Sequence, residues 1–351
     1  MNTNFLTTAI GSMPFEDPKK AVNLSLTALD APIWPQLPRL GLYEQMEIQY
    51  SEGIPTVVVD TEKSRMFLQT DGDYSEDFAA FYEQYLLATD PDEGNGDFSG
   101  MAISEGYSRG IYELEKALQG KKLPWLKIQT TGPCSFELTI VDENKRAIYY
   151  NEEFRDVIIK ALAMKCRWQL KKFAPYAEKF ICFIDEPILS AFGSSTYVSV
   201  KREDVVAILS EVIEAVHAEN ALAGIHCCGN TEWSILIDAG VDIVNFDAFS
   251  YGETIAMYAD SVKAHLERGG MLAWGVVPTS AAIREQTVET LEAQLEKVMD
   301  HLAAQGIDKG LIMRQAIITP SCGTGSLEVA DAERVFELLP ALSKRMKEKY
   351  F

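Results

Sequence analysis

The chain has 351 residues, 47% of them hydrophobic and 24% charged, which is typical of a globular protein with a sizeable core. Its formal net charge of −20 repels the phosphates of nucleic acids and the anionic headgroups of lipids, so nucleic-acid and membrane partners are not expected. No apolar run approaches the roughly 20 residues of a membrane span, no secretory signal opens the chain, and the six cysteines need no disulfides, which predicts a cytoplasmic protein with reduced thiols.

Short segments rich in β-branched residues alternate with long amphipathic stretches, the pattern of βα units that form a parallel sheet. We expect strands at 6–11, 55–60, 126–131, 180–185, 223–228, 242–247, 271–277 and 315–319. Between them, apolar residues recur at helical spacing, as in 205–216 and 291–302. About eight such units without a Pro-, Gly- or Ser-rich linker predict a single (β/α)8 barrel over residues 1–351.

The stretch 61–120, between the second and third expected strands, is longer than one crossover helix. We interpret it as an insertion with helices and an exposed acidic loop at 90–97, which covers either the active face or only the rim. The alternative fold, an open doubly wound sheet, usually carries a Gly-rich turn after its first strand. Here Ile10-Gly11-Ser12-Met13-Pro14 follows, without dinucleotide or P-loop spacing, which favours the barrel.

Three residues with metal-binding side chains fall at the carboxyl ends of expected strands, where barrel active sites form. His226 and Cys228 share a face of their strand because side chains alternate, whereas Cys227 points the other way. Cys322 follows the eighth strand in a Gly-rich turn, and Asp247 ends the sixth. One imidazole and two thiolates suit zinc, with Asp247 as a candidate fourth ligand.

Cysteine is often a small core residue, so core packing is the alternative for each of these thiols. We accept it for the four remaining cysteines, which are Cys134, Cys166, Cys182 and Cys227. Asp185, in Asp185-Glu186-Pro187 at the end of the fourth strand, is a candidate to bind a substrate ammonium group, and the alternative is that an acidic residue there caps the next segment. Ser12 and the backbone around Gly11 could receive a carboxylate, or simply form a tight turn.

Zinc beside a cation pocket and an anion pocket points to an amino acid that bears a thiol. A thiol bound to zinc loses its proton, which gives a thiolate nucleophile at neutral pH. Water activation is less natural, because catalytic sites of that kind favour neutral histidines.

The same residues resemble the catalytic C-terminal barrel of the cobalamin-independent methionine synthase family, which is related to uroporphyrinogen decarboxylases and methylcorrinoid:thiol methyltransferases. The matching motifs are Thr8–Pro14, Gln129–Pro133, Asp185-Glu186-Pro187, His226-x-Cys228 and Pro320–Gly323. The resemblance implies zinc on His226, Cys228 and Cys322, the acceptor carboxylate on Ile10 and Ser12, and the acceptor amino group on Asp185.

Three departures from that family bear on the methyl donor. The usual fourth ligand is Glu, where this chain has Asp247; the chain resembles a short form without the N-terminal half that helps to bind folate; and 275–280 lacks the family's proton-donating His after the seventh strand. Methyltetrahydrofolate needs a general acid, because an amine anion is a poor leaving group. A methylated corrinoid does not need one.

We therefore expect transfer of a methyl group from a methylated corrinoid, such as methylcobalamin or a corrinoid protein, to the zinc-bound thiolate of homocysteine. Coenzyme M as acceptor and methyltetrahydrofolate as donor are the nearest alternatives. A uroporphyrinogen-decarboxylase-like enzyme would need several arginines near the first strand, where 34–39 offers only Arg39. A zinc-stabilised binding protein would hold the metal with four protein ligands and no open position.

Overall fold

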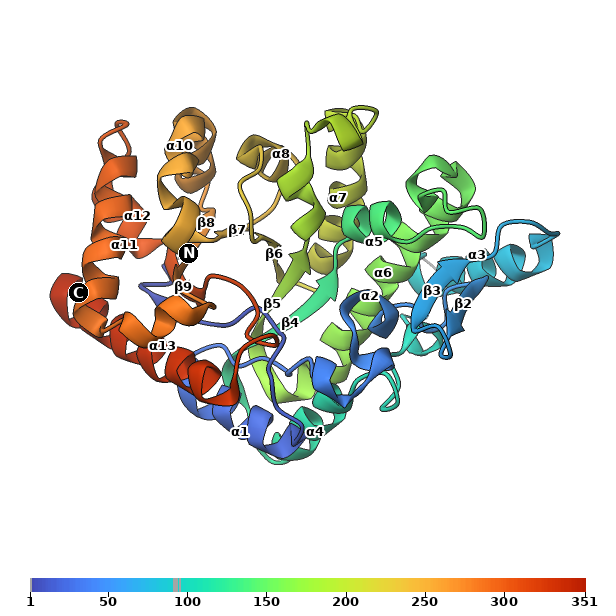
Figure 1. Ribbon diagram of the computed structural model, residues 1–351, viewed down its shortest axis with the longest axis horizontal. Helices are drawn as coiled ribbons and strands as arrows, with labels where there is room; N and C mark the ends of the chain where they lie inside the picture. The colour runs from blue at the N-terminus through green and yellow to red at the C-terminus, as the bar shows by residue number, and fades with distance from the viewer. Residues whose placement is uncertain (1, 91–93, 95) are drawn as a thin grey trace.

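The computed structural model describes residues 2–90, 94 and 96–351, and its centre is a curved parallel sheet with helices around the outside (Figure 1). Seven strands form this sheet in the order β1-β9-β8-β7-β6-β5-β4, and every neighbouring pair is parallel. Strands that follow one another in the chain are neighbours from β4 to β9, and β9 then pairs with β1, as in a (β/α)8 barrel. The seven strands are β1 (Leu6–Thr7), β4 (Leu123–Thr131), β5 (Ala177–Asp185), β6 (Leu222–Cys227), β7 (Ile243–Phe246), β8 (Met271–Val277) and β9 (Ala316–Pro320).

The segment 31–37 lies between β1 and β4, where a barrel needs its remaining strand. The N–H of Ala31 donates to the carbonyl oxygen of Thr7 at 2.9 Å, and the N–H of Lys127 donates to the carbonyl oxygen of Pro32 at 2.8 Å. Two isolated parallel bridges join the same segment to Ser12 and to Lys127. Prolines have no N–H, so Pro32 and Pro35 prevent a regular ladder here. The predicted (β/α)8 barrel is thus confirmed, with seven regular strands and one irregular segment in the second position.

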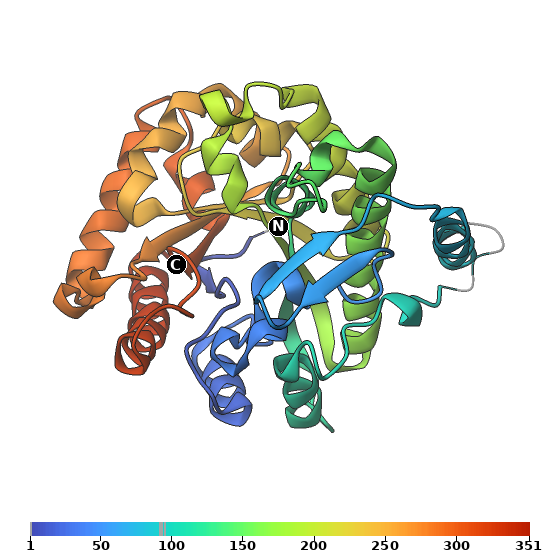
Figure 2. The ribbon, with the colours of Figure 1, turned by 45° about the vertical axis from the view of Figure 1, so that its right-hand side comes forward.

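The strand expected at 55–60 is not part of the barrel, so that prediction was wrong. β2 (Val57–Asp60) pairs in antiparallel fashion with β3 (Arg65–Leu68) in a separate two-stranded sheet, which Figure 2 shows as a hairpin in front of the main sheet. The residues of β2 are only partly buried. The run of three valines suggested a buried strand, whereas the true second position carries two prolines and has no β-strand signature.

The segment between the second position and β4 is therefore longer than the insertion predicted at 61–120, because it already begins near residue 38. It contains α2 (Met46–Gln49), the hairpin and α3 (Ser75–Thr89), followed by α4 (Arg109–Ala117), which packs against α1 (Pro18–Ala28). In Figure 1, α3 lies at the edge of the molecule, far from β9. Of the predicted acidic loop at 90–97, residues 91–93 and 95 lie outside the described residues.

Alternating side chains divide the apolar residues into two clusters. The larger cluster lies between the sheet and the helices, and includes the predicted stripes of α7 and α11. The smaller cluster, nine buried residues from the barrel strands and segment 31–37, comprises Leu6, Ile10, Ala31, Ile181, Phe183, Ile243, Met271, Ala273 and Ile317. The remaining helices are α5 (Pro133–Thr139), α6 (Glu152–Phe173), α7 (Arg202–His217), α8 (Trp233–Asp238), α9 (Ala248–Tyr251), α10 (Ala259–Glu267), α11 (Val288–Ala303), α12 (Lys309–Arg314) and α13 (Val329–Tyr350). In the described part of the chain, none of the helices could cross a bilayer.

A buried lysine of α6 fastens the inserted segment to the barrel. The Nζ of Lys165 donates to the carbonyl oxygen of Glu52 at 2.5 Å and to that of Met101 at 3.3 Å. Burial lowers the pKa of Lys165 from 10.5 to about 7. Between these values the unfolded chain binds one more proton than the folded protein, so this group makes the free energy of unfolding rise with pH.

We expect Lys165→Met to remove that rise. Between pH 7.5 and 9.0 wild type should gain about 2 kcal/mol relative to the variant, because one full proton is worth about 1.4 kcal/mol per pH unit. Urea denaturation of both proteins at the two pH values measures the difference, in which the contributions of all other groups cancel. Equal changes with pH in both proteins would contradict the assignment.

Candidate metal centre

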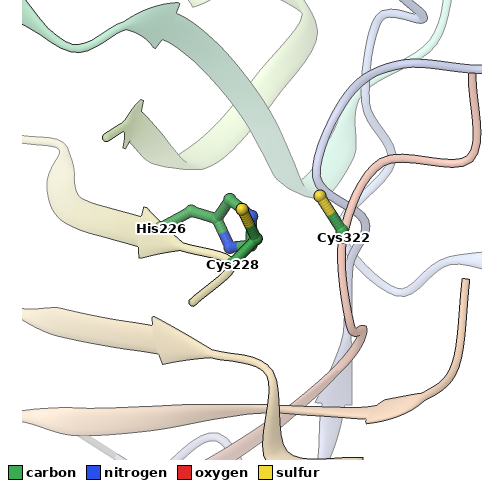
Figure 3. A group of neighbouring side chains, drawn as sticks. All are labelled: His226, Cys228 and Cys322. Atoms are coloured by element: carbon green, nitrogen blue, oxygen red, sulfur yellow. The ribbon is translucent and has the colours of Figure 1, made fainter. Parts of the chain in front are cut away.

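The structure brings His226, Cys228 and Cys322 together at the mouth of the barrel. His226 lies on β6, Cys228 directly follows it, and Cys322 follows β9 (Figure 3). Their candidate ligand atoms all lie within 4.8 Å of one another. Cys227 is fully buried on the opposite face of β6, within the cluster beneath the helices. The alternation of side chains thus separates two adjacent cysteines into one at the mouth and one in the core.

The two thiols of this group share a proton. A hydrogen bond from Cys322, helped by the nearby His226, lowers the pKa of Cys228 to about 4, and the same partner together with burial raises the pKa of Cys322. One sulfur is therefore a thiolate at neutral pH and the other a thiol that donates to it. A soft dication between two sulfurs would take the place of that proton, since thiolates are its preferred ligands.

Asn245 of β7 fixes the orientation of the imidazole. The Nδ2 of Asn245 donates to the carbonyl oxygen of Ala273 and to the Oγ1 of Thr319, both at 2.9 Å. Its Oδ1 must then be the acceptor for the Nδ1–H of His226, at 2.6 Å. In the neutral imidazole Nε2 is then the nitrogen without a proton, and it is buried with no hydrogen-bond partner among the described residues. A ring nitrogen that is buried without a partner, in an imidazole oriented through its other nitrogen, is suited to bind a metal ion.

Asn245 was not among the residues predicted from the sequence, although strand alternation places it on the same face as Asp247, two residues later. We expect Asn245→Ala to lower zinc affinity by about 10- to 100-fold, the usual effect of losing the hydrogen-bond partner of a ligating histidine. Competition with a chromophoric chelator measures the affinity. Val244→Ala, on the opposite face of β7, serves as the control, and equal zinc affinity in Asn245→Ala and wild type would refute the orienting role.

Asp247, the candidate fourth ligand, is placed differently from the other three. It precedes α9, where its Oδ1 accepts a hydrogen bond from the N–H of Ser250 at 2.8 Å. It is not part of the group whose ligand atoms lie within 4.8 Å. Burial raises the pKa of Asp247, and hydrogen bonds from Ser250 and the nearby His226 oppose this rise. Ligation by Asp247 stays a prediction, one that requires its side chain to leave the helix cap.

A cavity of about 460 Å³ opens beside the three residues, large enough for a small ligand and a second reactant. Strand ends contribute one wall, and the segment that begins at residue 36 contributes the other. The lining residues are Ile10, Ser12, Gln36, Pro38, Glu44, Gln45, Met46, Asp185, Pro187, His226, Cys228, Cys322, Gly323, Gly325 and Ser326. All three candidate substrate residues, Ile10, Ser12 and Asp185, are among them.

Asp185 and Glu186 have different environments although they are adjacent. Glu186 accepts hydrogen bonds from the N–H groups of Cys134 and Ser135 at 2.9 and 2.8 Å, so it caps the start of α5, the helix that follows the neighbouring strand β4, and not the segment that comes next in the chain. Asp185 lines the cavity, and its Oδ1 is buried without a hydrogen-bond partner among the described residues. Burial raises the pKa of Asp185 to about 6, although Lys127 and His226 oppose the rise. At neutral pH this carboxylate is ionised and available to a cation.

The turn 10–12 lines the same cavity as Asp185. The carbonyl oxygen of Ser12 accepts from the N–H of Thr324 at 2.8 Å, and its Oγ accepts from the N–H of Gly325 at 3.3 Å. A Cβ on Gly323 would lie 2.1 Å from the Oγ of Ser12, so only glycine allows this close approach. In the part of the chain that is described, the backbone N–H of Ser12 has no partner. It is a free donor for an anion.

The part of the cavity lining that the inserted segment provides was not foreseen from the sequence. Glu44, Gln45 and Met46 reach the cavity from the inserted segment, and Gln36 reaches it from the irregular strand position. The Oε1 of Glu44 accepts from the N–H of Arg109 at 3.0 Å, and burial raises the pKa of Glu44. Neither lysine nor arginine occurs among the described residues that line the cavity.

The chain resembles a solved protein structure in its fold. The chain is similar to the structure of a B12-independent methionine synthase from Shewanella sp. W3-18-1 in complex with selenomethionine, with a TM-score of 0.55 over 99% of each chain. The two proteins share a fold. Sequence identity is 12%, so the reaction has to be argued from the site. No protein-family model and no curated protein matches the chain.

Proposed function

We propose that this protein is a methyltransferase that moves a methyl group to the thiolate sulfur of homocysteine, with zinc on His226, Cys228 and Cys322. The observation that carries the proposal is the convergence of these ligand atoms within 4.8 Å, beside a cavity that also contains an unpartnered carboxylate oxygen. The methionine synthase that shares the fold supports the same reaction class.

The residues fit zinc in number and in chemistry. One unprotonated imidazole nitrogen and two sulfurs, one already a thiolate, match its preference for nitrogen and sulfur donors. When bound, zinc would lower the pKa of the acceptor thiol and keep its sulfur anionic at neutral pH. Three protein ligands leave a position for that sulfur, which distinguishes an enzyme from a protein that zinc merely stabilises.

Asp185 and the turn 10–12 would hold the two ends of the acceptor. The free Oδ1 of Asp185 accepts from the ammonium group, and the backbone N–H and the Oγ of Ser12 donate to the carboxylate. A sulfonate acceptor such as coenzyme M has no ammonium group and would leave Asp185 buried and unpaired, at a cost in binding. A substrate with several carboxylates, as for a decarboxylase, would find no lysine or arginine among the described lining residues.

For the donor we propose a methylated corrinoid. Folate donors carry glutamate carboxylates, and their nitrogen leaving group needs a proton. The described lining has no basic residue, and its one histidine is the proposed metal ligand. With a corrinoid, the acceptor sulfur attacks the methyl carbon, the C–S bond forms as the Co–C bond breaks, and the electron pair remains on cobalt without protonation. The solved neighbour is B12-independent, which favours methyltetrahydrofolate as the alternative donor.

A methyl-transfer assay with paired donors and acceptors tests the proposal. Methylcobalamin and methyltetrahydrofolate are each combined with homocysteine and with coenzyme M, on zinc-loaded and on chelated protein. We expect methionine from methylcobalamin and homocysteine, dependent on zinc. Product only from methyltetrahydrofolate would refute the donor, product only with coenzyme M would refute the acceptor, and full activity after chelation would refute the role of the metal.

A further inference from the structure

A buried lysine lies in the barrel interior. Lys127 of β4 is fully buried, and it is two residues before Gln129 on the same face of the strand. Its ammonium group lies 4.5 Å from the centre of the Phe183 ring, which belongs to the apolar cluster inside the barrel. A Cβ on Gly224 would lie 2.5 Å from that ring, so the glycine makes room for it. Lys127 thus lies among the apolar side chains that fill the barrel.

The hydrogen bonds of Lys127 lead to the turn that lines the cavity. Its Nζ donates to the carbonyl oxygen of Ile10 and, at 3.3 Å, to the Oε1 of Gln129. Gln129 in turn donates from Nε2 to the carbonyl oxygen of Trp34 at 2.9 Å. Lys127 therefore joins the turn that follows β1, the irregular second position and β4.

This lysine has no direct counter-ion. None of the described carboxylates lies within 4.0 Å of its Nζ; Asp185 interacts with it only at longer range. Burial lowers the pKa of Lys127 to about 8, which still leaves it mostly protonated at pH 7. An unpaired buried cation costs free energy, so its presence calls for a function.

We propose that Lys127 is a positioning residue, which holds the turn 10–12 in its anion-binding conformation and places a positive potential beneath the carboxylate of the acceptor. The inference rests on the proposed acceptor and goes beyond it by assigning the selectivity for the carboxylate to a residue outside the cavity lining. In an interior of low dielectric, a single charge acts over several ångströms.

The size of the effect depends on the charge of the ligand. Without Lys127, a thiol that carries a carboxylate loses both the fixed turn and the attractive potential. A thiol that carries only an ammonium group does not use the turn. For this thiol the loss of Lys127 has two opposing effects, because Lys127 repels the ammonium group but also holds down the pKa of Asp185. A purely structural role of Lys127 would instead weaken all thiols alike.

The test uses full-length protein loaded with cobalt(II), in which thiolate binding to the metal changes the absorption spectrum, whereas zinc is spectroscopically silent. Wild type, Lys127→Met and the control Lys165→Met are titrated with homocysteine, 4-mercaptobutanoate and 3-mercaptopropylamine. Lys165 is a matched control because it is equally buried and also donates to backbone carbonyl groups, but does not contact the turn 10–12.

We expect Lys127→Met to weaken binding of homocysteine and 4-mercaptobutanoate roughly 10-fold or more, as for the loss of a charge-assisted contact. Binding of 3-mercaptopropylamine should change much less than binding of the two carboxylate thiols, and Lys165→Met should match wild type with all three. Equal weakening of all thiols, or no change, overturns the inference. Failure of wild type to bind homocysteine at the metal would instead refute the proposed function, so the two failures are distinguishable.

Discussion

Cys322→Ala is expected to abolish zinc binding and methyl transfer, whereas Cys227→Ala retains both. The sulfur of Cys322 is one of two sulfurs available to the metal, and the remaining His226 and Cys228 form only a two-point site. We expect zinc affinity to fall by more than ~100-fold, beyond the effect of losing a mere hydrogen-bond partner of a ligand. Metal analysis after dialysis and the methyl-transfer assay measure the two losses.

Cys227 is the control because it lies beside Cys228 in sequence but packs in the core beneath the helices. Its replacement by alanine removes a buried sulfur and costs some stability without touching the cavity. The circular dichroism spectrum of Cys322→Ala should match that of wild type, which excludes unfolding as the cause. A full zinc content in Cys322→Ala would refute the metal centre as described.

Asp185→Asn is expected to raise the KM for homocysteine by roughly 100-fold, as for truncating one partner of a buried charged pair. The kcat should change little, because the ammonium group lies at the opposite end of the acceptor from the reacting sulfur. Steady-state kinetics with saturating donor separates the two constants. Zinc content should be unchanged, since Asp185 is not part of the three-residue group.

The acceptor 4-mercaptobutanoate provides an internal control for Asp185→Asn, because it lacks the ammonium group. Its KM should be similar in wild type and variant. If both acceptors weaken equally, Asp185 acts on the cavity as a whole, and the assignment of an amino acid as acceptor loses its main support.

The alternation of strand-like and helix-like segments in the sequence predicted every strand position of the barrel except the second. Regular strands such as β5 and β8 coincide with short apolar runs, and seven of the eight expected strands overlap barrel strands. The second position could not be found in this way, because Pro32 and Pro35 remove the hydrogen-bond donors on which a strand signature depends. The valines of β2 form a hairpin instead, which pairs locally with β3.

The site was foreseen where its residues belong to strand ends. His226, Cys228 and Cys322 were expected to meet because parallel strands of a barrel end at one face. Glu44 and Met46 could not be expected at the cavity, since their position depends on how the inserted segment folds back. Lys127 was missed because nothing in its local sequence indicates that a lysine would be enclosed by the barrel.

The cavity has two walls of separate origin. The wall with His226, Cys228 and Cys322 is built at the ends of strands that also carry the core, whereas the wall with Glu44 and Met46 belongs to a segment inserted between two strand positions. A change in the inserted segment could therefore alter the shape of the cavity and leave the strand ends as they are. The same modularity offers engineers a single stretch to graft when a cavity of different shape is wanted.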